Sequence, residues 1–210
     1  YKGFIMALVK LNNRGVRNVS AFGSVAGGSM TFIKKLTASS SSNLSFVDGS
    51  ASVVLDSTYK EYLFTFNNIH PETDNTILKF NASIDSGSNY NVTKTTTSFD
   101  AFHSEADDAA QMGYNTSHDL AQSTAAQTLL RDIGNANDES ASGYLHLFDP
   151  SSTTFVKHFI STGNSHQHQS ISVNQYNAGY FNTTSAIDAI QFSMSSDAID
   201  AGDICLYGIK

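Results

Sequence analysis

Cysteine, proline and tryptophan are nearly absent from this chain of 210 residues, which has one cysteine, two prolines and no tryptophan. A single cysteine excludes an intramolecular disulfide framework. Cys205 stands between Ile204 and Leu206 in an apolar, strand-like run. We therefore expect it to be a small buried hydrophobic side chain and not a nucleophile.

Charged residues are also scarce, at 15% of the chain, with a net charge of -7. The basic residues are scattered, and Lys34 and Lys35 form the densest pair. Nucleic-acid phosphates and anionic membrane surfaces both require a clustered basic face. No run approaches the ~20 apolar residues of a membrane helix, and the start lacks the apolar core of a signal peptide. We expect no nucleic acid partner and no membrane insertion.

The common motifs of catalysis are missing. The sequence contains no G-x-S-x-G, no Walker loop, no H-E-x-x-H and no G-x-G-x-x-G fingerprint. We therefore expect a protein that is not an enzyme, with no catalytic residue, cofactor or metal. An enzyme that uses the segment from His103 to His118 as its site is the least favoured alternative.

Alternation of apolar and polar residues recurs along most of the chain, which is typical of half-buried strands. Tyr62, Phe64 and Phe66 share one face of the clearest strand. The strands are expected at residues 30–36, 43–47, 60–66, 76–84, 90–99, 124–133, 143–148, 154–161, 166–175, 189–194 and 203–209, and residues 52–55 could extend the second of them. Residues 124–133 could equally be helical. Counting the strongest of these runs, we expect an all-β fold, an antiparallel, jelly-roll-like β-sandwich of about ten strands.

Turn residues predict how some of these strands pair. Hairpins are expected between residues 76–84 and 90–99, between 143–148 and 154–161, and between 189–194 and 203–209. Residues 100–120 break the alternation and are expected to form a long loop, with at most one or two helical turns.

The chain has no linker or repeat, so we expect one domain at residues 29–210 after an N-terminal arm at residues 1–28. The arm ends in the Gly-rich segment 23–29, and arms of this kind often pack on a neighbouring subunit. Met6 is a candidate natural initiator, in which case residues 1–5 are a tag or upstream sequence.

Histidines form two candidate pairs. His166 and His168 would share one face of a strand, a spacing that can bind a transition metal, but no third ligand is signalled nearby. His146 and His158 would lie on the two strands of one hairpin, where facing imidazoles could form a pH-sensitive pair. Exposed polar positions are favoured for the first pair, and separate, partly buried positions for the second.

Two acidic segments are candidates for metal or acid–base chemistry. Neither matches a known ligand spacing, so solvated loops are favoured for both. The first segment holds His103, Glu105, Asp107, Asp108 and His118, and the second holds Asp132, Asn135, Asn137, Asp138 and Glu139.

Tyrosines outside the clearest strands are candidates for contact with sugars. Aromatic rings offer an apolar face that matches the C–H face of a sugar. Tyr114, Tyr176 and Tyr180 are expected in loops, where they could stack on a glycan. The absence of tryptophan weakens this signal.

The end of the chain, residues 199–209, reads IDAGDICLYGI and resembles the close of small virion proteins of marine tailed bacteriophages. Residues 6–16 (MALVKLNNRGV), 56–62 (DSTYKEY), 134–140 (GNANDES) and 182–192 (NTTSAIDAIQF) resemble the same proteins. The resemblance spans nearly the whole chain from Met6.

This resemblance implies a structural or adhesive component of the virion, of the tail-fibre or capsid-decoration kind. It carries over no catalytic residue. We expect localisation in the virion and a homo-oligomer, a trimer, assembled through the N-terminal arm and an apolar face. Other virion proteins and a cell-surface glycan are the expected partners. The alternative is a free carbohydrate-binding module or lectin, which would be a monomer or dimer.

Overall fold

The computed structural model describes residues 29–210, in which every regular element is a β-strand. All pairings between these strands are antiparallel, which confirms the all-β prediction. The predicted arm at residues 1–28 lies outside the described residues. The strands are β1 (Met30–Thr37), β2 (Leu44–Val47), β3 (Glu61–Pro71), β4 (Thr76–Ser83), β5 (Lys94–Ser104), β6 (Ala110–Tyr114), β7 (Gln127–Ile133), β8 (Ala141–Phe148), β9 (Lys157–Gln167), β10 (Ile171–Phe181), β11 (Ala189–Met194) and β12 (Ile199–Ile209).

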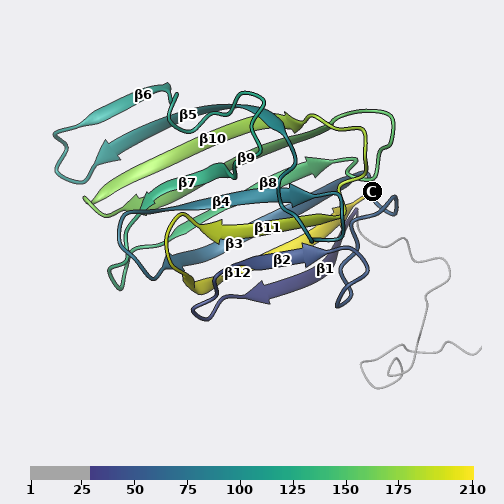
Figure 1. Cartoon of the computed structure of the whole chain (residues 1–210). Coiled ribbons are helices and arrows are strands. Elements are labelled where there is room, and N and C mark those ends of the chain that lie inside the picture. The colour runs from purple at the N-terminus through teal and green to yellow at the C-terminus, as the bar shows by residue number, and fades with distance from the viewer. Residues whose placement is uncertain (1–28) are drawn as a thin grey trace, which may run out of the picture.

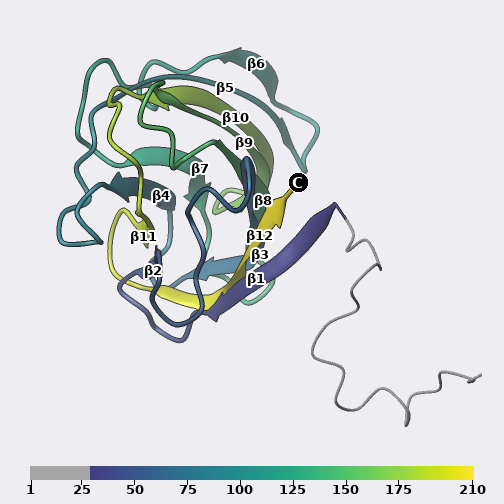
Figure 2. The same cartoon turned by 90° about the vertical axis from the view of Figure 1, so that its right-hand side faces the viewer.

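The twelve strands form one hydrogen-bonded sheet that is nearly closed, like a barrel. Its main path runs β1-β12-β3-β8-β9-β7-β4-β11-β2, and β10, β5 and β6 branch off from β9. We call β1, β12, β3, β8, β9, β10, β5 and β6 the long wall, and β7, β4, β11 and β2 the short wall. Figures 1 and 2 show the short wall facing one side of the long wall, with β6 and β1 at opposite ends. No helix within residues 29–210 is long and apolar enough to cross a membrane.

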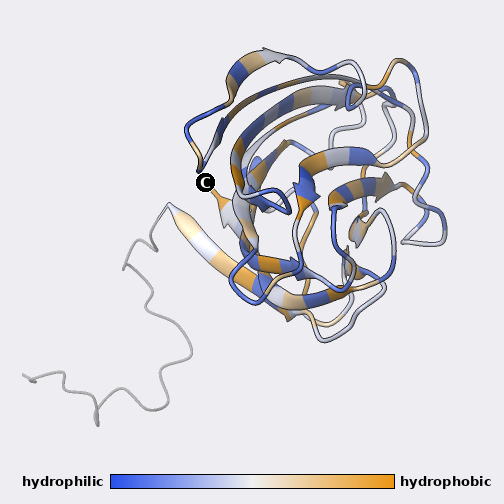
Figure 3. Cartoon of the chain, turned by 90° about the vertical axis from the view of Figure 1, so that its left-hand side faces the viewer, coloured by the Kyte–Doolittle hydropathy of each residue, from blue (hydrophilic) through white to orange (hydrophobic). Residues whose placement is uncertain are grey.

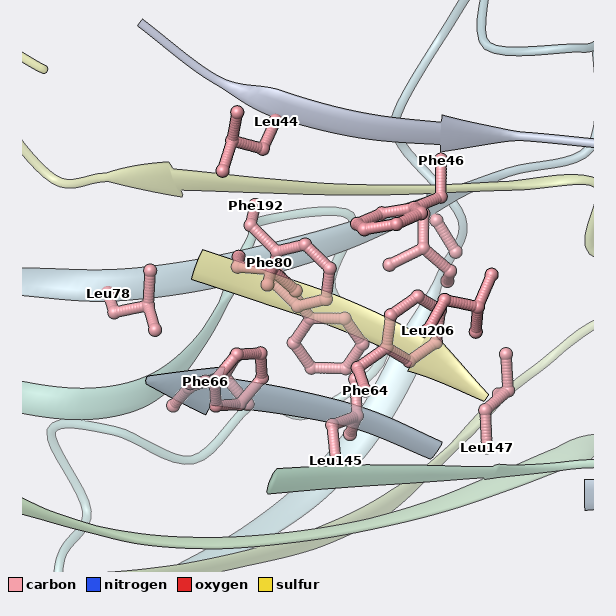
Figure 4. Packing of buried hydrophobic residues seen from close by; sticks show 14 of the residues in the cluster. Leu44, Phe46, Phe64, Phe66, Leu78, Phe80, Leu145, Leu147, Phe192 and Leu206 are labelled. Carbon is pink, nitrogen blue, oxygen red and sulfur yellow. The ribbon is translucent and has the colours of Figure 1, made fainter. Parts of the chain in front are cut away.

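The core lies between the two walls. Tyr62, Phe64 and Phe66 of β3 point into it and are at most 2% exposed, which confirms the inward face predicted for this strand. Phe192 of the short wall packs edge-to-face against Phe64 and Phe66, with ring centroids 5.4 and 5.3 Å apart (Figure 4). Each such buried side chain stabilises the fold by roughly 1.5–3 kcal/mol. Hydrophobic and hydrophilic residues alternate along many of the strands, as Figure 3 shows.

A pair of glycines lies where the sheet folds over from β9 to β7. Gly143 of β8 stands directly opposite Gly163 of β9. A Cβ atom on Gly163 would lie 2.7 Å from Leu130 of β7 and 2.7 Å from the Ser142 carbonyl oxygen. β7 pairs with β9 in the β-sheet register at one position only, Ile133 opposite Gln167. The missing side chain of Gly163 therefore lets β7 approach closely enough to begin the short wall.

Of the three predicted hairpins, one is confirmed and two are wrong. β8 and β9 pair along residues 141–147 and 159–165, as predicted. β4 pairs with β7 and β11 instead of β5, and β5 pairs with β10 and β6. The terminal hairpin is also wrong, because β11 pairs with β2 and β4 while β12 lies between β1 and β3. In both cases the connection crosses from the short wall to the long wall, so both strands turn their apolar side towards one shared core.

Several strand boundaries also differ from the prediction. Residues 166–175 are not one strand, because β9 ends at Gln167 and β10 runs from Ile171 to Phe181 after a tight turn with Ser170 at φ 57°. The expected long loop 100–120 contains the end of β5 and all of β6. Residues 52–55 form no strand, and Ser52 has a φ of 68°, which interrupts extended backbone. Residues 127–133 are a strand and not a helix.

Candidate binding face on the long wall

The side of the long wall that faces away from the core carries a row of aromatic side chains. Tyr144 of β8 stands opposite Thr162 of β9, which stands opposite Tyr176 of β10. The row continues through Phe99 of β5 to Tyr114 of β6. Directly opposed residues of neighbouring strands lie on the same side of a sheet, so these five side chains share one surface.

Exposed apolar side chains gather on this surface. Ten large hydrophobic side chains are exposed in residues 29–210, and two of them, Ile84 and Phe155, lie elsewhere. The other eight face outward from the long wall: Met30, Phe32, Phe99, Met112, Tyr114, Tyr144, Ile160 and Tyr176. We call this surface the aromatic face. Exposed apolar side chains gathered on one face often mark interaction sites, so we take the aromatic face as the candidate binding surface.

Two hollows adjoin in the middle of the aromatic face, with volumes of about 250 and 430 Å³. Both include Ile160, Ala178 and Thr97, which are opposed residues of β9, β10 and β5. Ala178 is the smallest of the three and leaves the space open. We call the two hollows together the aromatic groove. Its outward side chains are Thr95, Thr97, Phe99, Tyr144, His158, Ile160, Thr162, Tyr176, Ala178 and Tyr180.

Polar groups beside the aromatic groove are held in a chain of hydrogen bonds. The Thr162 hydroxyl donates to Asn174 Oδ1 at 3.5 Å, and Asn174 Nδ2 donates to the Tyr176 hydroxyl oxygen at 2.6 Å. Because Tyr176 accepts in this chain, its own hydroxyl proton is free to donate to a ligand. The groove therefore combines apolar walls with a polar group of fixed direction.

The aromatic rings are also held in place by one another. Phe99 and Tyr176 stack with centroids 4.8 Å apart and an interplanar angle of 10°. Tyr144 makes an edge-to-face contact with His146 at 5.5 Å, and His158 lies 6.1 Å from Tyr180. Ring pairs of this kind stabilise the folded state by roughly 0.5–1.5 kcal/mol beyond the effect of burial. These contacts therefore restrict the rotamers of the side chains that line the groove.

The opposite side of the same strands is buried and polar. Asn177 Nδ2 donates to the Leu129 carbonyl at 3.1 Å, and Gln175 Nε2 donates to the Ser98 hydroxyl at 3.1 Å. The amide oxygen of Gln175 has no hydrogen-bond partner in the part of the chain that the structure describes. These bonds fix β10 to β7 and β5 in one position, because breaking a buried hydrogen bond is costly.

The three tyrosines predicted to contact a glycan share the aromatic face, but they lie on strands and not in loops. Tyr176 and Tyr180 are on β10 and line the aromatic groove. Tyr114 ends β6, one strand beyond Phe99 and outside the groove. Its hydroxyl donates to Asp119 Oδ2 at 2.6 Å, and this hydrogen bond raises the pKa of Tyr114.

Phe99, Tyr144 and Ile160 belong to the aromatic groove but were not predicted as site residues. The alternation of residues 143–148 places Tyr144, His146 and Phe148 on one face and Leu145 and Leu147 on the other. This pattern, with two aromatic rings and an imidazole on the face opposite two leucines, is the sequence signal that indicates an exposed aromatic site at Tyr144. Phe99 and Ile160 had no such signal, because they become neighbours of Tyr176 only through the pairing of β5, β10 and β9.

The predicted histidine and acidic sites stay dispersed. His103 Nε2 lies 3.1 Å from Asp107 Oδ1, and His166 Nε2 lies 3.3 Å from Glu105 Oε1. His168 lies in the turn after β9 and not on a strand face with His166. Within residues 29–210 no three His, Cys, Asp or Glu side chains are grouped so that they could hold a metal ion.

The remaining candidates are also separate. His146 stands opposite Ile160 and not opposite His158, which stands opposite Tyr180. In the second acidic segment, Glu139 accepts the backbone N–H of Ala136 at 2.8 Å, a bond that closes the turn.

Comparisons with known proteins add no relative: no family model, no curated protein and no solved structure matches the chain. The function is therefore argued from the geometry of the long wall.

Proposed function

We propose that the chain is a non-enzymatic structural protein of a tailed-bacteriophage virion, a tail-fibre or capsid-decoration component that contacts the host surface. The observation that carries the proposal is the gathering of eight exposed large hydrophobic side chains on the aromatic face. A surface of this kind is suited to binding and not to chemistry. The resemblance of residues 199–209 to the end of phage virion proteins supports the same function.

The partners proposed are further copies of the chain, in a trimer, and other virion proteins. Met30 and Phe32, which are 52% and 57% exposed, lie on β1, an edge strand of the described sheet. Residues 1–28 directly precede this strand in the sequence. An edge strand with exposed apolar side chains favours contact with another chain.

For the fold, we propose a jelly-roll-like sandwich in which β9 joins the two walls.

A free carbohydrate-binding module is the second candidate, and the aromatic groove favours it. Such a module would bind a sugar without assembling into a particle. The two candidates differ most clearly in the native mass of the protein, because the module would be a monomer or dimer.

The native mass of the purified full chain, measured by size-exclusion chromatography with light scattering, tests the proposal. We expect a trimer or a larger closed assembly. Phe32→Ser should weaken this assembly, because it removes an exposed apolar contact at the β1 edge. Phe155→Ser removes a side chain that is equally apolar and 71% exposed but lies off the aromatic face, so it should leave the mass unchanged. A monomeric wild-type protein would contradict the proposal and favour the free module.

A further inference from the structure

We propose that the aromatic groove binds a neutral oligosaccharide, with one pyranose ring seated between Tyr144 and Tyr176 and the chain continuing over Ala178 towards Tyr180. This inference rests on the host-surface contact of the proposed function and assigns it a site and a ligand class.

The spacing of Tyr144 and Tyr176 fits one sugar ring between them. Thr162 separates them in the row across β8, β9 and β10. Neighbouring strands lie 4.7–4.9 Å apart, so the two tyrosines start from backbones about 9.5 Å apart. Apolar groups are in contact at about 4 Å, which leaves room for a single saturated ring with a tyrosine on each side. The short side chain of Thr162 keeps this space open.

The chemistry of the groove fits a sugar better than an aliphatic ligand. The ring faces of Tyr144 and Tyr176 match the C–H faces of a pyranose. The Thr162–Asn174–Tyr176 chain of hydrogen bonds lies beside them, with the Tyr176 hydroxyl proton free to donate to a sugar oxygen. An aliphatic chain would cover this donor without offering it a partner, which is unfavourable.

The absence of charge in the groove favours a neutral sugar. Its lining includes no Asp, Glu, Lys or Arg. Apart from His158 at its far end, the groove would offer an acidic sugar no countercharge in return for the hydration that it loses.

The groove is long enough for more than one ring. Tyr176 and Tyr180 are four residues apart on β10, which corresponds to about 13.5 Å along a strand. Ala178 lies between them and is flanked by Ile160 and Thr97. A chain of linked rings can therefore follow the strand, with Tyr180 and His158 at its far end.

Isothermal titration calorimetry of the full chain tests the inference. The probes are neutral glucan, mannan and galactan oligosaccharides, with an oligogalacturonate as the acidic comparison. We expect at least one neutral probe to bind with micromolar to millimolar affinity and to bind more tightly than the acidic one. Tyr176→Ala and Tyr144→Ala should each weaken this binding at least tenfold, whereas Phe155→Ala should not change it.

Ala178→Leu is a second variant that removes no aromatic side chain. The added side chain would fill the low point between Ile160 and Thr97, so we expect it to block the sugar. Binding that survives both Tyr176→Ala and Ala178→Leu would overturn the inference, and so would the lack of binding by every neutral probe at millimolar concentration.

The outcomes separate this inference from the proposed function. A stable trimer that binds no sugar would overturn the sugar site alone. If Tyr176→Ala also lowers the native mass of such a protein, the aromatic face is an interface between copies. A monomer that binds a neutral sugar would instead overturn the virion function and keep the site.

Discussion

Two lysines lie in the interior on either side of one phenylalanine. Lys94 of β5 and Lys157 of β9 both stand opposite Phe181 of β10, and both side chains are fully buried. Lys94 Nζ donates to the Ala125 carbonyl at 2.6 Å, and Lys157 Nζ donates to the Thr183 carbonyl at 3.1 Å. Burial disfavours the charged ammonium and lowers the pKa of Lys94 to about 8, from an ordinary value of 10.5. The fold therefore carries an electrostatic cost at neutral pH that a neutral side chain would not carry.

This cost predicts a pH dependence of stability at the Lys94 site. Below pH 8 the ammonium is charged in both the folded and the unfolded chain, so the full cost is present. Between pH 8 and 10.5 the folded chain releases the proton first, and stability rises with pH by up to about 1.4 kcal/mol per unit. We expect the free energy of unfolding of the wild type, measured by urea denaturation, to rise by roughly 3 kcal/mol relative to Lys94→Met across this window.

The comparison with Lys94→Met removes the contributions to the pH dependence of stability that the two proteins share. Burial also lowers the pKa of Lys157, but that lysine is present in both proteins. Parallel stability profiles for the two proteins between pH 8 and 10.5 would show that Lys94 titrates normally in the folded chain.

At the scale of the elements, the β8–β9 hairpin contributes to both the core and the aromatic face. Its inner side carries Gly143 and Gly163, and the missing side chain of Gly163 leaves room for Leu130 of β7. Its outer side carries Tyr144, Thr162 and Ile160, which form one wall of the aromatic groove. One hairpin thus joins the two walls and positions the proposed sugar site.

Gly163→Ala should lower the free energy of unfolding by roughly 1–3 kcal/mol, because the new methyl group overlaps Leu130 and the Ser142 carbonyl. Gly113→Ala is the matched control, since its nearest atom is Gln111 Nε2 at 3.8 Å. Both changes restrict the unfolded chain equally, so the difference between them reports the folded state. Thermal or urea denaturation measures this difference. Equal stabilities of the Gly163→Ala and Gly113→Ala variants would mean that the approach of β7 does not need a glycine at position 163.

The sequence predicts which residues face the core more reliably than which strands pair. Alternation identifies the inward face of β3, because side chains alternate sides along any strand. Pairing depends on where the connections run. Residues 85–93 and 195–198 look like hairpin turns, but they carry the chain between the walls. Alternation cannot distinguish a hairpin turn from a connection between the walls, since both place the same side chains inward.

The binding face was predictable only in part for the same reason. Tyr176 and Tyr180 were named from their residue type, although they were expected in loops. Their neighbours Phe99 and Ile160 come from β5 and β9, more than fifteen residues away from Tyr176 in sequence. A groove made by three strands is visible only once the register of all three is known. A single sequence carries no direct signal of that register.

At the scale of the whole molecule, the long wall has one buried side and one exposed, aromatic side. The short wall and the inner side of the long wall enclose the core (Figure 2), and the outer side of the long wall carries the aromatic face. The edge strand β1 lies at one end of this wall, and residues 1–28 precede it in the sequence. This arrangement allows copies to assemble at one end while the groove at β8, β9, β10 and β5 stays open to a sugar.

The most direct test of the central claim is to locate the protein in a virus particle. Particles of a tailed bacteriophage that encodes the chain would be purified, analysed by mass spectrometry and labelled for electron microscopy with an antibody against residues 29–210. The account predicts that the chain is a stoichiometric component and that the label decorates the outside of the head or the tail. Particles that lack the chain, with all of it free in the lysate, would contradict a structural role in the virion.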